Sequence, residues 1–380
     1  MNNNGFLFDT ALDLIYLVSC SVNKTAPEPA RVEAMNLQNV FRLAKKHSLT
    51  TAAAFAVEQA AVLPDYFLEA KSKAVRKLAL YDIERKRVTD ALESNKIWYA
   101  PLKGSVLKWC YPKTAMREMT DVDILCDSSR MEDVSKIMQE LGFSCKQFGN
   151  GAHDTYVKPP AAKFDMHRTL FAENRQPLLS EYYRDVKNRL HRCENLSYGY
   201  HMTVGDLYIY VLCHLYKHYR FSGTGLRSLL DIYVFNKTHG SALNSGYINA
   251  ELEKLGLKSF EAEVRSLAIK VFNGKHLNQS EKDELMFFIE SGSHGSYKNY
   301  TLKALQNDNS KNRKTKYLIK RVFPDKETVK ANYPVVYRHS FLYPALIIYR
   351  PVKGLIIHPK KLLREFRRVK NYKPTDNKGR

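Results

Sequence analysis

The chain has 380 residues, of which 44% are hydrophobic and 26% are charged. This length allows two domains of ordinary size, and the apolar content is sufficient for a sizeable core, so a single small module and a largely disordered chain are both excluded. Sixty Lys and Arg against 39 Asp and Glu give a formal net charge of +21, which predicts affinity for a polyanion: a nucleotide, a nucleic acid or an anionic membrane surface.

The cysteines and the apolar segments of the sequence indicate where in the cell the protein is expected. The six cysteines form no Cys-x-x-Cys pair, so neither a zinc module nor a dense disulfide framework is indicated. The N-terminal residues lack the positively charged region of a signal peptide. The longest apolar run near the C-terminus, Phe341 to Tyr349, is about half as long as the ~20 residues of a membrane-spanning helix. We therefore expect a cytoplasmic protein with no transmembrane segment, either free or held peripherally at the membrane.

Residues 1–95 have the pattern of an N-terminal helical region. An alanine-rich stretch runs from Thr51 to Ala61, and the segment after Pro64-Asp65 places Tyr81, Val88 and Leu92 at gaps of seven and four. Such gaps bring apolar side chains to one face of a long helix.

Residues 96–200 change to the pattern of a small sheet domain with both helices and strands. The predicted strands are Ile97 to Ala100, Asp121 to Cys126, Phe143 to Gln147 and Lys163 to Arg168. Short helices are predicted for Ser105 to Cys110 and for Met131 to Leu141, and Gly149-Asn150-Gly151 predicts a loop that turns the chain.

Helical periodicity returns in residues 201–350, and residues 351–380 form a basic tail. Arg227 and Asp231 lie four apart on one predicted helix, so we expect an intrahelical ion pair. Residues 311–380 hold 20 Lys and Arg against four Asp and Glu, so +16 of the net charge lies there. Three alternatives are open for the basic tail: it binds RNA, its Lys360 to Lys370 stretch lies against an anionic lipid surface, or that stretch is a solvated basic helix that packs one face on the domain.

Two carboxylates on one predicted strand and a third on another have the chemistry of a magnesium site. Asp121 and Asp123 flank Val122, and alternate side chains of a strand share a face about 6.6 Å apart along the chain. Asp165 lies on the later strand, with His167 on the same face. Carboxylate oxygens are preferred ligands of Mg²⁺, and such ions clamp the attacking and leaving oxygens of a phosphoryl displacement. We expect the first two acids at an exposed strand end.

The predicted strand-to-helix junction at Gly104-Ser105 has the features of a phosphate site. Unpaired backbone N–H groups at such a junction favour phosphate, and Gly104 has no side chain to block its approach. Arg117, as a bidentate fork, and Lys103, as a point charge, would neutralise phosphate charge. Taken singly these features have ordinary explanations, since most Asp-x-Asp pairs are solvated strand ends and most isolated cations are surface charges. Their order along the chain favours a nucleotide site.

The same order of residues resembles a known family. Segments similar to the uncharacterised bacterial nucleotidyltransferase family of the polymerase-β-like nucleotidyltransferase superfamily are Leu102-Lys103-Gly104, Tyr111-Pro112, Arg117, Asp121-Val122-Asp123-Ile124-Leu125 and Asp165-Met166-His167, within a likeness from about Leu12 to Arg350. The resemblance implies that Gly104 and Ser105 hold the nucleotide phosphates and that Asp121 and Asp123 bind Mg²⁺. It further implies that Asp165 is a third catalytic acid, which assists the metal or deprotonates the acceptor.

We therefore expect an α+β fold in which a small mixed nucleotidyltransferase sheet is flanked by N-terminal and C-terminal helical regions. The expected function is Mg²⁺-dependent transfer of an NMP from an NTP donor to an acceptor hydroxyl or phosphate, with release of pyrophosphate. The acceptor would be a small molecule, a saccharide or RNA. The alternatives are an RNA-modifying nucleotidyltransferase toxin and a catalytically idle protein that binds a nucleotide or polyanion, although all three acids that catalysis needs are present.

Overall fold

The computed structural model of the protein describes residues 3–372, except 294, 296, 307–309, 311, 325, 327, 330–332 and 358. The chain divides into two compact units. The first comprises Met1–Tyr216 and Gly225–Ser293, and the second comprises Lys217–Thr224 and His294–Arg380. Helices precede and follow a mixed sheet in the first unit, which confirms the expected α+β class. The predicted division into four parts stays a prediction.

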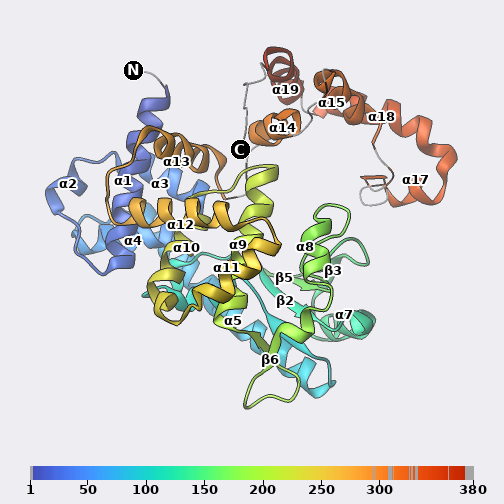
Figure 1. The fold of residues 1–380 in the computed structure, drawn as a ribbon, viewed down its shortest axis with the longest axis horizontal. Coiled ribbons are helices and arrows are strands. Elements are labelled where there is room, and N and C mark those ends of the chain that lie inside the picture. Colours follow the sequence, from blue (N-terminus) through green and yellow to red (C-terminus); the bar gives the residue numbers. More distant parts are fainter. Residues whose placement is uncertain are drawn as a thin grey trace. The chain divides into compact units, whose positions relative to one another are not determined.

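The N-terminal part of the first unit is a layer of helices. These are α1 (Asn3–Asn23), α2 (Pro29–Glu33), α3 (Leu37–His47), α4 (Thr50–Gln59) and α5 (Asp65–Ser94). Every side chain of α4 from Thr50 to Val57 is buried, because its small alanines let α1, α3 and α5 pack closely against it. In Figure 1 the blue helices α1, α3 and α4 lie together with α13, whereas β2, β5 and α7 lie together elsewhere in the first unit.

Five strands form the sheet in the order β1-β2-β5-β4-β3. Their bounds are Tyr99–Pro101 for β1, Val122–Cys126 for β2, Ser144–Gln147 for β3, His153–Lys158 for β4 and Ala162–His167 for β5. Strands β2 and β5 pair in parallel and the other neighbours pair antiparallel, so the sheet is mixed, as expected. The helices α6 (Gly104–Leu107) and α7 (Met131–Glu140) lie between these strands in the sequence.

Strand β4 was not predicted from the sequence, which indicated only a loop between the third and fourth predicted strands. Its side chains alternate between more and less buried, but Asp154 occupies one of the fully buried positions. That carboxylate is paired with the Arg168 guanidinium. A buried charged residue breaks the apolar alternation by which a strand is recognised in a sequence.

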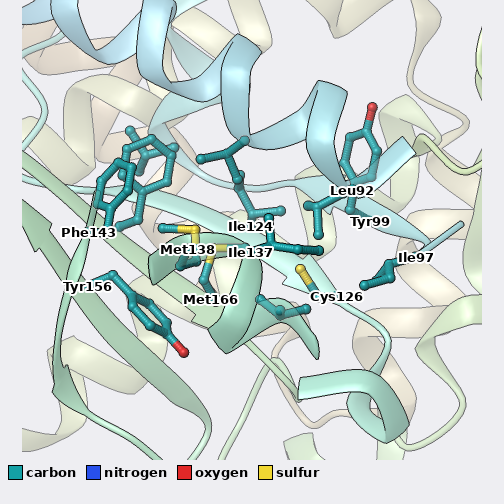
Figure 2. Close-up of a cluster of buried hydrophobic side chains, with 14 of the residues drawn as sticks. Leu92, Ile97, Tyr99, Ile124, Cys126, Ile137, Met138, Phe143, Tyr156 and Met166 are labelled. Atoms are coloured by element: carbon teal, nitrogen blue, oxygen red, sulfur yellow. The ribbon is translucent and has the colours of Figure 1, made fainter. Parts of the chain in front are cut away.

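A hydrophobic cluster fixes one face of the sheet. Ile124 and Met166 of the sheet are fully buried together with Leu92 of α5 and Met138 of α7. Figure 2 shows Ile124 and Met166 directed into the same cluster as Ile137 and Met138. Because successive side chains of a strand point to opposite faces, the residues that alternate with this cluster lie on the other face of the sheet.

The C-terminal part of the first unit is again helical, with a two-stranded ribbon that the sequence did not predict. Its elements are α8 (Pro177–Tyr182), β6 (Leu190–Arg192), β7 (Tyr200–Met202), α9 (Val204–Phe221), α10 (Leu226–His239), α11 (Ser245–Lys254), α12 (Lys258–Phe272) and α13 (Gln279–Ser291), of which α9 ends in the second unit.

The second unit is formed by short helices around a small core of Leu305, Tyr317 and Val369. The helices are α14 (Tyr297–Gln306), α15 (Arg313–Val322), α17 (Pro334–Arg338), α18 (Tyr343–Ile357) and α19 (Pro359–Asn371). By length and composition alone, two stretches of the described residues could cross a membrane: Gly5–Asn23, half of which is buried, and Ser340–Ile357, of which 6% is buried. The expectation of no transmembrane segment stays a prediction.

His47 connects the N-terminal helices to the C-terminal helices of the first unit. Its side chain is fully buried, with Nδ1 accepting from Leu226 N at 3.1 Å and Nε2 within 3.1 Å of Ile289 O. Nδ1 can accept only while the ring is neutral. Burial, reinforced by the charges of Lys46 and Arg227, lowers the pKa of His47 from 6.5 to about 3.

This environment predicts a loss of stability in mild acid. Below about pH 6.5 the unfolded chain binds a proton on His47 that the folded chain does not, so the free energy of unfolding decreases as the pH falls towards 3. Between about pH 7 and pH 5, urea unfolding should show that the native protein loses up to about 2 kcal/mol more than a His47→Gln variant does. Parallel losses in the two proteins would contradict a buried neutral imidazole.

Candidate active site

The predicted acids lie on the face of the sheet opposite the hydrophobic cluster. In the parallel pairing of β2 with β5, Asp123 is directly opposite Asp165, and Leu125 is opposite His167. Asp121 immediately precedes β2. The tertiary structure therefore gathers three carboxylates that are up to 44 residues apart in the chain.

Asp123 is the most enclosed of the three acids. Its side chain is buried, and Oδ1 accepts hydrogen bonds from Lys103 Nζ at 2.6 Å and His167 Nε2 at 2.7 Å. Burial by itself raises the pKa of the Asp123 carboxyl, but the Lys103 ammonium and the His167 hydrogen bond outweigh it and hold this pKa well below 3.8. The expectation of an exposed strand end is therefore wrong for Asp123, because Lys103 makes burial of the charge possible.

Asp121 and Asp165 share a different cation. Lys163 Nζ lies 3.2 Å from Asp121 Oδ2 and 3.3 Å from Asp165 Oδ2. Asp165 is buried and accepts a further hydrogen bond from Thr155 Oγ1 at 2.7 Å, whereas the Asp121 side chain is 29% exposed. The two carboxylates thus converge on one positively charged nitrogen at the surface of the site.

Two histidines accompany the acids. The His153 and His167 ring centroids are 4.9 Å apart, and His153 Nε2 lies 3.8 Å from Asp165 Oδ2. Burial, with a smaller contribution from the neighbouring His167 ring, lowers the pKa of His153 to about 4. His153 therefore carries a neutral imidazole at pH 7 beside the Asp165 carboxylate. Sequence analysis missed His153 because it lies on the strand that was not predicted.

Lys103 is placed by a strained turn between β1 and α6. Its backbone has φ of 45°, a conformation that costs a non-glycine residue of the order of 1–3 kcal/mol. Leu102 N donates to Asp123 O at 3.0 Å, so the turn is bound to β2 through the backbone as well as through the lysine side chain. The strained backbone and the buried ion pair therefore occur together.

Three buried polar atoms in this part of the first unit have no hydrogen-bond partner among the described residues. They are Ser105 Oγ, Tyr210 Oη and His167 Nδ1. The charges of Lys103 and Asp123 act on the Tyr210 hydroxyl, which places it in the same site. An unpaired buried polar atom costs about 1–3 kcal/mol, a cost that a bound substrate or water would remove.

Arg117 is held within the protein and closes the space above Gly104. Its Nε and Nη2 donate to Asp231 Oδ1 and Oδ2, each at 2.9 Å, and Tyr111 Oη donates to Asp231 Oδ1 at 2.7 Å. A Cβ at Gly104 would lie 2.6 Å from Arg117 Nη1.

The prediction that Arg227 pairs with Asp231 within one helix is wrong. The Asp231 carboxylate is bound by Arg117, and Arg227 Nη1 donates to Glu118 O at 3.2 Å. The predicted phosphate-binding roles of Gly104, Ser105 and Arg117 stay predictions.

The three carboxylates carry the oxygen atoms that a hard divalent cation prefers. Within the part of the chain that the structure describes, no group of three or more His, Cys, Asp and Glu side chains is arranged to hold a metal ion. The ammonium groups of Lys103 and Lys163 lie against the acids instead. The donor chemistry fits a hard divalent cation nevertheless, because Asp121 and Asp165 direct carboxylate oxygens to one shared cationic group.

A pocket of about 510 Å³ adjoins Asp121. Its walls come from α3, the start of α4, α5 and the segment before β2: Phe41, Lys45, Ser48, Thr50, Tyr66, Glu69, Ala70, Lys73, Ala74, Lys77, Leu78, Tyr81, Ala115, Arg117, Glu118, Met119 and Thr120. Thr120 is next to Asp121 in the chain, and the charge of Asp121 acts on Lys77. The pocket was not predicted from the sequence, because its residues come from the N-terminal helical region and from the segment just before the Asp121 to Cys126 strand, which lie far apart in the chain.

The buried Arg117–Asp231 pair predicts a large effect on stability. In an Asp231→Asn variant the Arg117 charge remains buried without its counter-charge, so urea unfolding should show a loss of about 3–5 kcal/mol. The matched control is Asp90→Asn, which removes the exposed partner of Lys86 and should change stability by about 1 kcal/mol or less. Equal losses of stability in the two variants would show that the folded protein does not need Asp231 to compensate the buried charge of Arg117.

Residues 33–273 match the model of the uncharacterised nucleotidyltransferase family, and this stretch includes the acids, the pocket and the Arg117–Asp231 pair. It is shorter at both ends than the likeness from Leu12 to Arg350 noted in the sequence. No curated protein and no solved structure is detectably similar to the chain. The family match covers more than half of the chain, which therefore belongs to the uncharacterised nucleotidyltransferase family and is a transferase enzyme, as the sequence predicted.

Proposed function

We propose that this enzyme transfers an NMP from an NTP to an acceptor hydroxyl or phosphate, with release of pyrophosphate and with the help of Mg²⁺. The observation that carries the proposal is the register of β2 and β5, which sets Asp123 beside Asp165 on the polar face of the sheet. Displacement at phosphorus depends chiefly on positioning and on neutralisation of charge. The acids and lysines of this face are suited to both.

Asp121, Asp123 and Asp165 are the residues that would hold Mg²⁺. When bound, the ion would supply positive charge to the transferring phosphoryl group. Lys163, which now bridges Asp121 and Asp165, would be released from them, and its ammonium group would be available to the phosphates. Lys103 and His167 would keep Asp123 ionised and oriented.

The acceptor is proposed to lie beside Asp165. The carboxylate is the candidate for accepting the proton of the attacking group, and Thr155 Oγ1 orients it through a hydrogen bond of 2.7 Å. The neutral imidazole of His153 lies on the same side and can hydrogen-bond an acceptor hydroxyl.

The pocket beside the acids is suited to a substrate that bears phosphate. Among the described residues the ammonium groups of Lys45, Lys73 and Lys77 have no carboxylate partner, although those of Lys45 and Lys77 lie over the Phe41 and Tyr81 rings. Burial lowers the pKa of Lys77. Glu69 and Glu118 also line the pocket, but Glu118 Oε1 accepts hydrogen bonds from Thr51 N and Oγ1. An anion in contact with Lys77 would therefore offset the cost of removing that ammonium group from water.

The proposed reaction predicts which acids are indispensable. The protein would be incubated with each labelled NTP, Mg²⁺ and a cell extract, and the labelled product would be followed. Asp123→Asn and Asp165→Asn should each lower the rate by about 10²-fold or more, because they remove charge and a positioned base. Asp90→Asn, on the exposed surface of α5, is the control.

Folding must be measured in the same samples, because both substituted acids are buried. Circular dichroism and the urea midpoint identify a variant that has lost its structure. A folded Asp123→Asn or Asp165→Asn enzyme with unchanged turnover and unchanged Mg²⁺ dependence would remove the acids from the mechanism.

The pocket gives a second prediction. Lys77→Ala should raise KM for the phosphate-bearing substrate about tenfold or more, since a charge-assisted hydrogen bond contributes about 1.5–3 kcal/mol. Arg76→Ala removes the same charge from the neighbouring position of α5, does not line the pocket, and should leave KM unchanged. Steady-state kinetics of both variants measures the two KM values. Equal increases in KM would show that Lys77 contributes only general electrostatic attraction.

A further inference from the structure

We propose that α18 and α19 of the second unit bind the surface of an anionic membrane. This inference is independent of the proposed reaction. It starts from the exposed side chains of α18, of which Ile348 is 69% exposed, Leu355 61% and Ile356 75%. Ile348 and Leu355 lie seven residues apart, and Val352 between them is also exposed, so they form an apolar stripe along one face of the helix.

Helix α19 continues this surface and adds positive charge. Leu363 and Phe366 are 58% and 56% exposed, and Arg364, Arg367 and Lys370 are exposed beside them. Gly354 of α18 allows close approach of α19, since a Cβ there would lie 3.0 Å from Leu362 Cδ1. The two helices thus present apolar and cationic side chains together.

The only acidic residue in the sequence of these two helices is withdrawn from the surface. Glu365 is buried, where it accepts a hydrogen bond from Tyr317 Oη at 2.6 Å and pairs with Arg321 Nε at 2.9 Å. Its charge is therefore neutralised inside the second unit. Arg364, Arg367 and Lys370 face solvent without a nearby exposed carboxylate from either helix.

The composition of α18 favours a position along the membrane surface over a spanning one. Arg350 and Lys353 lie within the apolar stretch, and each charged residue near the centre of a spanning helix costs about 2.5–3.5 kcal/mol. A helix with an apolar stripe and flanking cations instead lies in the interface, with its apolar side chains among the lipids and its cations at the phosphates.

Charge distinguishes a membrane from other occupants of this surface. Residues 1–310 hold 40 Lys and Arg against 35 Asp and Glu, so the rest of the chain is itself positive. A second copy would bring the same cations against this face, and like charges repel. Nucleic acid would use the cations but would leave the aliphatic stripe uncovered. An anionic bilayer matches both the charge and the apolar side chains.

The test measures sedimentation of the full chain with vesicles. Vesicles of phosphatidylcholine with about a quarter phosphatidylglycerol should bind the protein, pure phosphatidylcholine vesicles should bind it at least about tenfold more weakly, and salt should weaken binding. An Ile348→Asp/Ile356→Asp variant and an Arg364→Gln/Arg367→Gln variant should each lose about tenfold or more. The control variants Ile83→Asp and Arg76→Gln alter exposed residues of α5 in the first unit and should bind normally.

The results of these measurements distinguish a membrane from the other possible partners of this surface. Equal binding to both kinds of vesicle, or binding by neither, overturns the proposal. So does an Ile348→Asp/Ile356→Asp variant that binds vesicles normally, because the cations alone would then account for the affinity. A decrease in oligomer size for that variant in gel filtration, without any change in vesicle binding, assigns the face to a second copy. Circular dichroism of each variant confirms that the second unit is folded.

Discussion

The buried ion pair between Lys103 and Asp123 is the interaction on which the candidate site depends. Removing an ammonium group and a carboxylate from water costs several kcal/mol for each, and only close contact with further hydrogen bonds offsets that cost. A distance of 2.6 Å and the added bond from His167 meet this condition. The pair joins the turn after β1 to β2, and so sets Gly104 and Ser105 beside the acids. Strained backbone of the kind found at Lys103 gathers at functional sites.

A second buried pair connects this turn to the C-terminal helices. Arg117 fills the space that Gly104 leaves, and Asp231 of α10 holds the guanidinium through two hydrogen bonds. Any larger residue at position 104 would displace Arg117 and thereby disturb its bond to α10. The sheet and the helices that follow it are therefore coupled through polar contacts, and not only through the hydrophobic cluster on the opposite face of the sheet.

The positively charged side chains have different neighbours in the two units. In the first unit, lysines alternate with carboxylates and aromatic rings around a pocket, an arrangement suited to a compact anion such as a phosphate group. In the second unit, the cations lie among exposed aliphatic side chains, which suits an extended anionic surface. The charge is positive in both units. The side chains that surround the cations therefore determine which kind of anionic partner each unit suits.

The sequence by itself determined the class of the fold, the main helices and four of the five strands, because apolar periodicity and turn residues are local signals. It also predicted the three acids as one candidate set, because their order along the chain is recognisable. Only the tertiary structure decided that Asp123 is buried against Lys103, that Lys163 joins Asp121 to Asp165, and that Arg117 pairs with Asp231. It also revealed β4, where the buried charge of Asp154 hides the strand pattern. The reason is physical: ion pairs and pockets depend on strand register and helix packing, which join residues far apart in the chain.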